Sequence, residues 1–263
     1  MITLDRNNLE ESLKEAKKRM NDFGNKLKFI INPFIDDTLP KKEVIEVCHV
    51  GKFLVVLDKE IKLLEKAKPP KPDFIIEYAG EKIGLEVERI FNLEEVQNIK
   101  SKQGLFEKAA HEFENSNPKI NVMVNFWTIE GFKFEGNDKK SLISEINSFV
   151  IEIVNGNNPV YPSFIEKADF IPHSRVNFNF NEGGYSSEDI SNLTLNEAIQ
   201  KKEAKFSQYK LNTGLDRQWL LLVSDIGSDS FNIEDVELPK EIESQFEHIY
   251  LLEDFEARVT EIK

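Results

Sequence analysis

The pattern of apolar and polar positions along the chain predicts helices that alternate with strands. Apolar residues recur at helical spacing in residues 9–21, 41–66, 104–114, 141–154 and 194–210. Runs rich in β-branched and aromatic residues predict strands at 27–34, 73–78, 82–90, 121–129, 175–180, 218–225 and 248–254. This order of elements predicts an α/β protein, in which helices pack on the faces of a sheet.

One stretch interrupts this pattern. Residues 155–191 are rich in Asn, Gly, Pro and Ser, which is typical of an insertion, and they contain the predicted strand 175–180. Residues 1–40 are expected to form an N-terminal extension of one helix and one strand. Residues 41–263 are expected to form the main domain.

Composition and charge narrow the classes of protein. The formal net charge is −13, which argues against a protein that coats nucleic acid, although a local basic patch can still hold a phosphate backbone. The single cysteine, Cys48, rules out a disulfide within the chain and suits a reducing compartment. The N-terminus has no apolar leader segment, and no apolar run approaches the roughly 20 residues of a membrane span. We therefore expect a cytoplasmic protein without a membrane partner.

Acidic residues gather on two neighbouring predicted strands. The proline-rich run 66–72 cannot be helical and leads in extended form to Asp73. In the second strand, Glu86 and Glu88 share a face with Gly84, because side chains alternate along a strand. A tight loop at 79–81 would place Asp73 opposite residue 87 or 88, and Gly84 would leave open space beside the acids.

Two interpretations of this cluster stay open. Three carboxylates repel one another, so a cation among them would stabilise the arrangement. Oxygen ligands alone favour Mg²⁺, Mn²⁺ or Ca²⁺ over zinc. The same acids could instead be ordinary solvated groups on an exposed strand.

The segment PKPDFIIEYAGEKIGLEVERI resembles the signature of the PD-(D/E)XK, or restriction endonuclease-like, nuclease superfamily. The matching positions are Pro72-Asp73 and, on the next strand, Glu86-Val87-Glu88. The resemblance implies a mixed sheet flanked by helices and a nuclease that uses Mg²⁺, or Mn²⁺, to hydrolyse phosphodiester bonds in nucleic acid, here DNA. Asp73 and Glu86 would bind the metal, and Glu88 would bind metal or activate the attacking water.

This chain departs from the signature at one position, because Glu88 stands where the superfamily has its lysine. Some restriction endonucleases of the superfamily tolerate Glu there. The alternative is a nuclease-like domain that no longer cuts and serves as a binding or regulatory module, as in a defence or mobile-element system. A further alternative is a protein-interaction component of such a system, with residues 155–191 as the contact surface for another protein. A homodimer is also open.

The helix predicted from Thr194 carries a candidate for the missing cation. Thr194 and Glu197 have the spacing of a capping box at its start. Lys202 lies within an apolar stripe, where a lysine needs an acidic partner or a stem that reaches water. If Lys202 has an acidic partner, its side chain points at the acidic cluster. Superfamily relatives often carry Lys, Gln or Tyr on this helix, so the resemblance also makes Lys205 and Tyr209 candidate contacts to nucleic acid.

The helix predicted at 41–66 offers a fourth acid. Glu60 lies at the centre of its apolar face and is a candidate metal ligand, although Glu43 or Glu46 could fill that place. Glu60 could instead pair with a nearby lysine. Further candidates for phosphate contacts are scattered lysines, namely Lys66, Lys68, Lys71, Lys100, Lys102 and Lys201.

Overall fold

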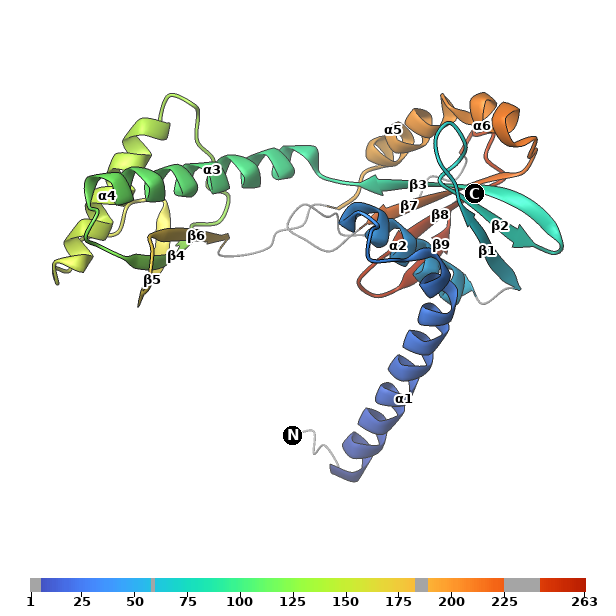
Figure 1. Cartoon of the computed structure of the whole chain (residues 1–263), viewed down its shortest axis with the longest axis horizontal. Coiled ribbons are helices and arrows are strands. Elements are labelled where there is room, and N and C mark those ends of the chain that lie inside the picture. Colours follow the sequence, from blue (N-terminus) through green and yellow to red (C-terminus); the bar gives the residue numbers. More distant parts are fainter. Residues whose placement is uncertain (1–5, 58–59, 183–188, 225–241) are drawn as a thin grey trace. The chain divides into compact units, whose positions relative to one another are not determined.

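The chain forms two compact units, which we describe separately. A computed structural model describes residues 6–57, 60–182, 189–224 and 242–263. Unit 1 comprises Met1–Phe91 with Glu188–Lys263, and unit 2 is Asn92–Ser187 (Figure 1). This division differs from the expected one, because the inserted unit begins at Asn92 rather than near residue 155. The strand predicted at 121–129 pairs only within unit 2, so it belongs to a second sheet.

Unit 1 is built on a six-stranded mixed sheet. Its strand order is β1-β2-β3-β7-β8-β9. The strands are β1 (Ile61–Lys66), β2 (Phe74–Tyr78), β3 (Glu81–Ile90), β7 (Gln218–Ser224), β8 (His248–Glu253) and β9 (Arg258–Glu261). The first three strands form an antiparallel meander, β3, β7 and β8 run parallel, and β9 is antiparallel to β8. The expected α/β fold with a mixed sheet is therefore confirmed.

Helices cover both faces of this sheet. They are α1 (Arg6–Ile31), the short 3-10 helix η1 (Asn32–Phe34), α2 (Lys41–Leu57), α5 (Asn192–Glu203) and α6 (Phe206–Thr213). Figure 1 shows α2 on one side of the sheet, with α5 and α6 on the other. Ile83, Leu85 and Val87 of β3 pack in the core that α2 covers. Leu220 and Leu222 of β7 pack in the core that contains α5 and α6.

The prediction of an N-terminal strand at 27–34 is wrong. α1 continues through Gly24 to Ile31, and η1 follows at Pro33. Leu27 and Ile31 recur at helical spacing and pack closely on α2 at Gly51, where an added Cβ would lie 2.3 Å from the Ile31 side chain. This contact keeps the segment helical, because its apolar face is buried against another helix.

The helix predicted at 41–66 is correct only as far as Leu57. Residues 61–66 instead form β1, which pairs antiparallel with β2 in the register Ile61↔Tyr78 and Lys66↔Phe74. The sequence of β1, IKLLEK, has good helix formers, but edge pairing with β2 overrides this local preference.

Only two residues, Ala79 and Gly80, join β2 to β3. Both have positive φ, 52° and 80°, as a type I′ hairpin turn requires. The expected loop was one residue longer, so the predicted register was also wrong. Phe74 pairs with Leu85, which places Asp73 beside Glu86 rather than opposite residue 87 or 88.

Unit 2 has its own sheet and its own core. The strands β4 (Val122–Thr128), β5 (Ile165–Pro172) and β6 (Asn177–Glu182) are arranged in the order β5-β4-β6, with the helices α3 (Leu93–Ser116) and α4 (Lys139–Val154). Phenylalanines dominate the core: the buried ring of Phe126 contacts those of Phe106 and Phe178. The sequence predicted β4, β6 and α4 but missed β5. None of the helices in the described parts of either unit is long and apolar enough to cross a membrane.

Candidate functional site

Glu86 lies at the centre of a polar cluster on the face of the sheet that α5 and α6 cover. The alternation of β3 places Ile83, Leu85 and Val87 in the opposite core and turns Glu86 toward the two helices. Its side chain is 3% exposed. Oε1 accepts hydrogen bonds from Lys202 Nζ at 2.5 Å and from Tyr209 Oη at 2.7 Å, and Oε2 accepts one from the backbone N–H of Asp73 at 3.1 Å. Both carboxylate oxygens of this buried acid are therefore satisfied.

Asp73 joins the cluster from the residue that precedes β2. Its Oδ2 accepts a hydrogen bond from the backbone N–H of Val87 at 2.9 Å, so the two strands exchange bonds through the side chains of Asp73 and Glu86. The Asp73 side chain is 36% exposed. It is therefore the acid of the cluster that solvent and a diffusible ligand reach most easily.

Lys202 connects all the acids. It belongs to the buried stripe of α5, together with Leu195 and Ile199, and only 9% of its side chain is exposed. Its Nζ lies 2.5 Å from Glu86, 3.2 Å from Glu88 and 3.8 Å from Asp73. The structure thus brings together the four residues that the sequence put forward as catalytic, and it places an ammonium group where their carboxylates converge.

Glu88 lies at the outer side of the cluster. It points to the same face as Glu86, and 15% of its side chain is exposed. One oxygen contacts Lys202 and the other is bound by Lys201, which is largely exposed. Glu88 therefore holds two lysines from α5.

The pKa shifts follow from burial and from this crowding of charge. Burial raises the pKa of Glu86 and Asp73 raises it further, while Lys202 and Tyr209 act against the rise without cancelling it. Burial disfavours the ammonium form of Lys202, but Glu86, Asp73 and Glu88 outweigh that effect and raise its pKa. Lys202 is therefore a cation at neutral pH. Burial and the hydrogen bond to Glu86 raise the pKa of Tyr209, which remains a neutral donor.

The acid that α2 contributes is Glu46 rather than Glu60. The pKa of Glu46 is raised by burial and then by the charge of Asp73, which places the two acids within electrostatic range of each other. Glu60 is exposed and immediately precedes β1. Because Ile61 pairs with Tyr78, Glu60 lies at the far end of the β1–β2 pair from Asp73. The prediction that Glu60 binds metal assumed that Glu60 lies on a helix. That assumption is wrong, because α2 ends at Leu57, and the metal-binding role of Glu60 stays a prediction.

Two other expectations about α5 and α6 need correction. Ser191, not Thr194, caps α5, because its Oγ accepts a hydrogen bond from the Thr194 backbone N–H at 3.1 Å. Tyr209 is buried and donates to Glu86, so it positions this acid and does not present its hydroxyl to nucleic acid. Lys205 lies exposed between α5 and α6, where a nucleic acid can reach it.

The space beside Gly84 is filled rather than open. A Cβ at Gly84 would lie 2.1 Å from Gln218 Oε1 and 2.9 Å from the Pro72 ring. Gln218 is fully buried and its Nε2 donates to the Leu215 carbonyl at 3.1 Å. Gly84 is therefore needed for the close approach of β7 and of the loop that carries Asp73. The sequence offers Glu46 only as an alternative to Glu60 and does not single out Gln218, because the role of Gln218 depends on which strands pair.

The donor set suits a hard cation, but the acids do not enclose one by themselves. Within the described residues, no three carboxylate, thiolate or imidazole groups are arranged to hold a metal ion. The carboxylates of Asp73, Glu86 and Glu88 point at Lys202 instead. Carboxylate oxygens have spare lone pairs, and the three carboxylates face only the ammonium groups of Lys201 and Lys202 within the described residues, so one formal negative charge remains in excess. A cation that approaches Asp73 from its exposed side would relieve this excess.

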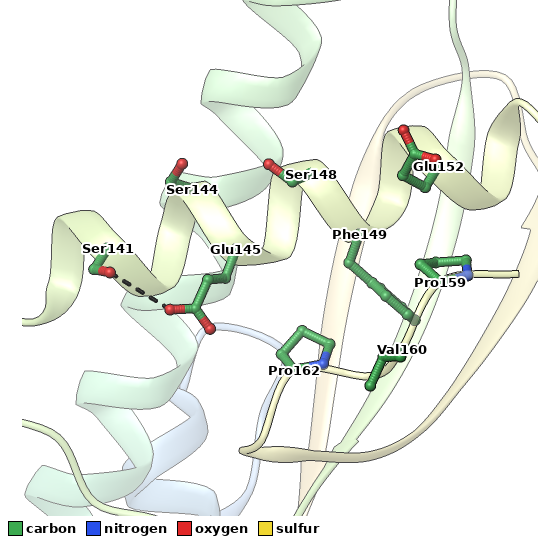
Figure 2. Close-up of a pocket in the computed structure, with 9 residues that line it drawn as sticks. All are labelled: Ser141, Ser144, Glu145, Ser148, Phe149, Glu152, Pro159, Val160 and Pro162. Atoms are coloured by element: carbon green, nitrogen blue, oxygen red, sulfur yellow. Dashed lines mark hydrogen bonds between the residues drawn. The ribbon is translucent and has the colours of Figure 1, made fainter. Parts of the chain in front are cut away.

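A groove on unit 2 is a weaker candidate for chemistry. Its volume is about 390 Å³, and it lies between α4 and the segment 159–162 (Figure 2). Ser141 donates to Glu145 at 3.4 Å, and the ring of Phe149 forms part of the wall. Among the described residues that line the groove there is no histidine or lysine to activate its serines as nucleophiles.

Comparison with known proteins adds no relative: no family model, no curated protein and no solved structure matches this chain.

Proposed function

We propose that unit 1 is a restriction endonuclease-like domain and that the chain is a Mg²⁺-dependent nuclease that hydrolyses phosphodiester bonds in DNA. The observation that carries this proposal is the contact of Lys202 with Asp73, Glu86 and Glu88. This contact supports the proposal because the cluster offers the acids and the lysine that a PD-(D/E)XK site would use, with the lysine on α5 in place of residue 88.

The order of elements supports the same proposal. A helix, α2, precedes the antiparallel meander β1-β2-β3, and α5 then leads to β7, which runs parallel to β3. This topology brings the start of β2, the middle of β3 and the buried face of α5 to one place. Unit 2 is inserted between β3 and α5, on the chain segment that connects the acids to their lysine.

Each side chain of the cluster has a task in this proposal. Asp73 and Glu86 would hold Mg²⁺ or Mn²⁺, which polarises the phosphate and lowers the pKa of bound water. Lys202 binds the phosphate oxygen on which negative charge grows in the transition state. Glu88 keeps the Lys202 ammonium close to Glu86, and Tyr209 fixes the orientation of the Glu86 carboxylate.

One observation favours a second candidate, a nuclease-like binding or regulatory module that does not cut. The Lys202 ammonium already contacts every carboxylate of the cluster, so it partly balances their charge without a metal. In that case the four residues stabilise unit 1 as a buried ion network, and neither Mg²⁺ nor Mn²⁺ binds.

The test is cleavage of supercoiled plasmid and of linear and single-stranded DNA in the presence of Mg²⁺ or Mn²⁺. Asp73→Asn and Glu86→Gln keep the hydrogen-bond geometry and remove the charge, and we expect each to reduce cleavage by about 100-fold or more. Glu81→Gln is the matched control, because Glu81 is an exposed acid of the same hairpin that pairs with Arg217. It should cut like the wild type.

The outcomes separate the two candidates. Cleavage that survives in both Asp73→Asn and Glu86→Gln contradicts the nuclease assignment. A wild-type protein that neither cuts DNA nor binds Mn²⁺ in calorimetry supports the binding module instead.

A further inference from the structure

A lysine-lined pocket lies next to the acidic cluster. It has a volume of about 450 Å³ and is formed by the loop that joins β1 to β2 and by Asn212 near the end of α6. Lys66, Lys68 and Lys71 line it. Glu65 also lines the pocket, so three lysines face one carboxylate there. In a chain with a net charge of −13, this is a local excess of positive charge.

Two of these lysines are only loosely neutralised. Lys71 pairs with Glu65 at 3.3 Å, and both side chains are more than 40% exposed, so this ion pair contributes little and can exchange for another anion. Lys68 forms no ion pair within the described residues. Lys66 is the exception, because it is mostly buried and bonded to Glu43 at 2.5 Å. Lys68 and Lys71 are therefore the cations available to a ligand.

The loop holds these two lysines in a fixed turn. The Lys71 backbone N–H donates to the Lys68 carbonyl at 3.1 Å, and the Ala67 N–H donates to the Asp73 carbonyl at 2.9 Å. Pro69 and Pro70 lie between the lysines and restrict the backbone further. A site arranged in advance in this way loses little entropy when it binds an anion.

The pocket is close enough to the cluster to serve the same ligand. Lys71 is two residues from Asp73, so their Cα atoms lie within about 7 Å of each other. The Pro72 ring approaches Gly84, which places the loop on the face of the sheet that carries Glu86 and Glu88. Successive phosphates of a DNA strand advance by about 3.4 Å along the helix axis, so a strand with one phosphate at Asp73 places another near Lys71.

We propose that this pocket binds a backbone phosphate of the DNA strand, one or two nucleotides from the phosphodiester at the acidic cluster. Lys68 and Lys71 supply the charge, and the Asn212 side chain lines the same cavity. The inference rests on the proposed function, because it takes DNA as the ligand of the neighbouring cluster.

The test measures binding in EDTA, so that it does not depend on cleavage. Fluorescence anisotropy with a labelled DNA duplex and with its single strand, at a series of salt concentrations, compares wild type with Lys68→Gln/Lys71→Gln. The control is Lys62→Gln/Lys82→Gln. It removes one exposed lysine from β1 and one from β3, at the end of these strands that is far from the pocket. Lys62 pairs with Glu77 at 3.2 Å, and Lys82 has no ion pair within the described part of the chain, so this double variant also loses one paired and one unpaired lysine.

We expect the pocket variant to bind about tenfold more weakly, and its slope of log K against log salt to fall in magnitude by about 1–2, while the control keeps the wild-type slope. Equal affinity and slope in the two double variants would overturn the pocket, as would a wild type that binds neither DNA. Since Lys68 is exposed and unpaired in the described structure, the single variant Lys68→Gln gives the same comparison if the double variant unfolds.

The result stays distinct from that of the nuclease test. Weakened binding by the pocket variant, with a wild type that never cuts, retains the phosphate site and rejects the nuclease. Cleavage by wild type, with pocket and control variants that bind alike, rejects the phosphate site and retains the nuclease.

Discussion

Replacement of Lys202 by methionine tests the electrostatic basis of the cluster directly. Methionine keeps an unbranched apolar stem that fits the stripe of α5, but it removes the ammonium that contacts Glu86, Glu88 and Asp73. The loss of one partner from a buried ion pair typically costs about 3–5 kcal/mol, because the remaining charge is left uncompensated. For a domain of this size we expect a decrease in Tm of roughly 6–20 °C.

The pH dependence of this loss follows from Glu86. Its pKa in the folded protein is raised above the ordinary value of 4.5, chiefly by burial. Because the folded protein holds the Glu86 proton more tightly than the unfolded chain does, protonated Glu86 stabilises the fold fully below pH 4.5. This stabilisation is lost as the pH rises through the folded-state pKa. Lys202 opposes the rise, so Lys202→Met raises the pKa of Glu86 further. The deficit of the variant should therefore be largest at neutral pH and shrink toward pH 4.5.

The assay is thermal and urea unfolding of wild type, Lys202→Met, Glu86→Gln and the double variant, from pH 4 to pH 8. We expect Glu86→Gln to restore much of the stability that Lys202→Met loses, since the pair then leaves no buried charge at its centre. An unchanged Tm in Lys202→Met, or a deficit that is the same at every pH, would refute the reasoning.

A matched lysine separates stability from catalysis. Lys52 of α2 pairs with the buried Asp254 at 2.7 Å on the opposite face of the sheet. Lys52→Met should also destabilise unit 1 but should leave DNA cleavage unchanged at temperatures where it is folded. Equal losses of cleavage in Lys52→Met and Lys202→Met would show that Lys202 acts through stability alone.

Two further substitutions test the supports of the cluster. Gly84→Ala places a methyl group 2.1 Å from Gln218 and 2.9 Å from Pro72, and we expect it to lower stability by about 1–3 kcal/mol in urea unfolding and to reduce cleavage by displacing the loop. Tyr209→Phe removes the 2.7 Å hydrogen bond to Glu86, and we expect a loss of about 1.5–3 kcal/mol with a lower rate of cleavage at saturating metal.

Each of these predictions has a clear contrary result. Gly136→Ala is the control for the glycine, because no atom lies within 4 Å of the added Cβ, and equal effects of the two alanines would contradict the proposed crowding. A Tyr209→Phe protein with wild-type stability would show that the hydroxyl does not hold Glu86.

The local part of the site could be predicted from the sequence. Alternation along residues 82–90 places Glu86 and Glu88 on one face, and the helical spacing of Leu195, Ile199 and Lys202 along α5 directs Lys202 inward. Both rules depend only on the geometry of a single element. The meeting of Lys202 with Glu86 followed from the need of a buried lysine for an acid.

The parts that failed depend on contacts between elements. Glu60 was placed on a helix, because nothing within 61–66 reveals that β2 is available for pairing. The sequence predicts open space at Gly84, because the residue that fills it, Gln218, is distant in sequence. The extent of unit 2 was missed for the same reason, since its strands resemble those of unit 1 and only pairing assigns them to a separate sheet.

The position of unit 2 has a consequence for how the molecule can change. In the chain of unit 1, the whole of Asn92–Ser187 is a single long connection between β3 and α5. The entropy needed to close such a connection grows only with the logarithm of its length, so its contents place little demand on the sheet that it interrupts. Unit 2 is therefore exchangeable: a different module, or a short linker, can take its place while β3 and α5 continue to present Glu86 and Lys202 to each other.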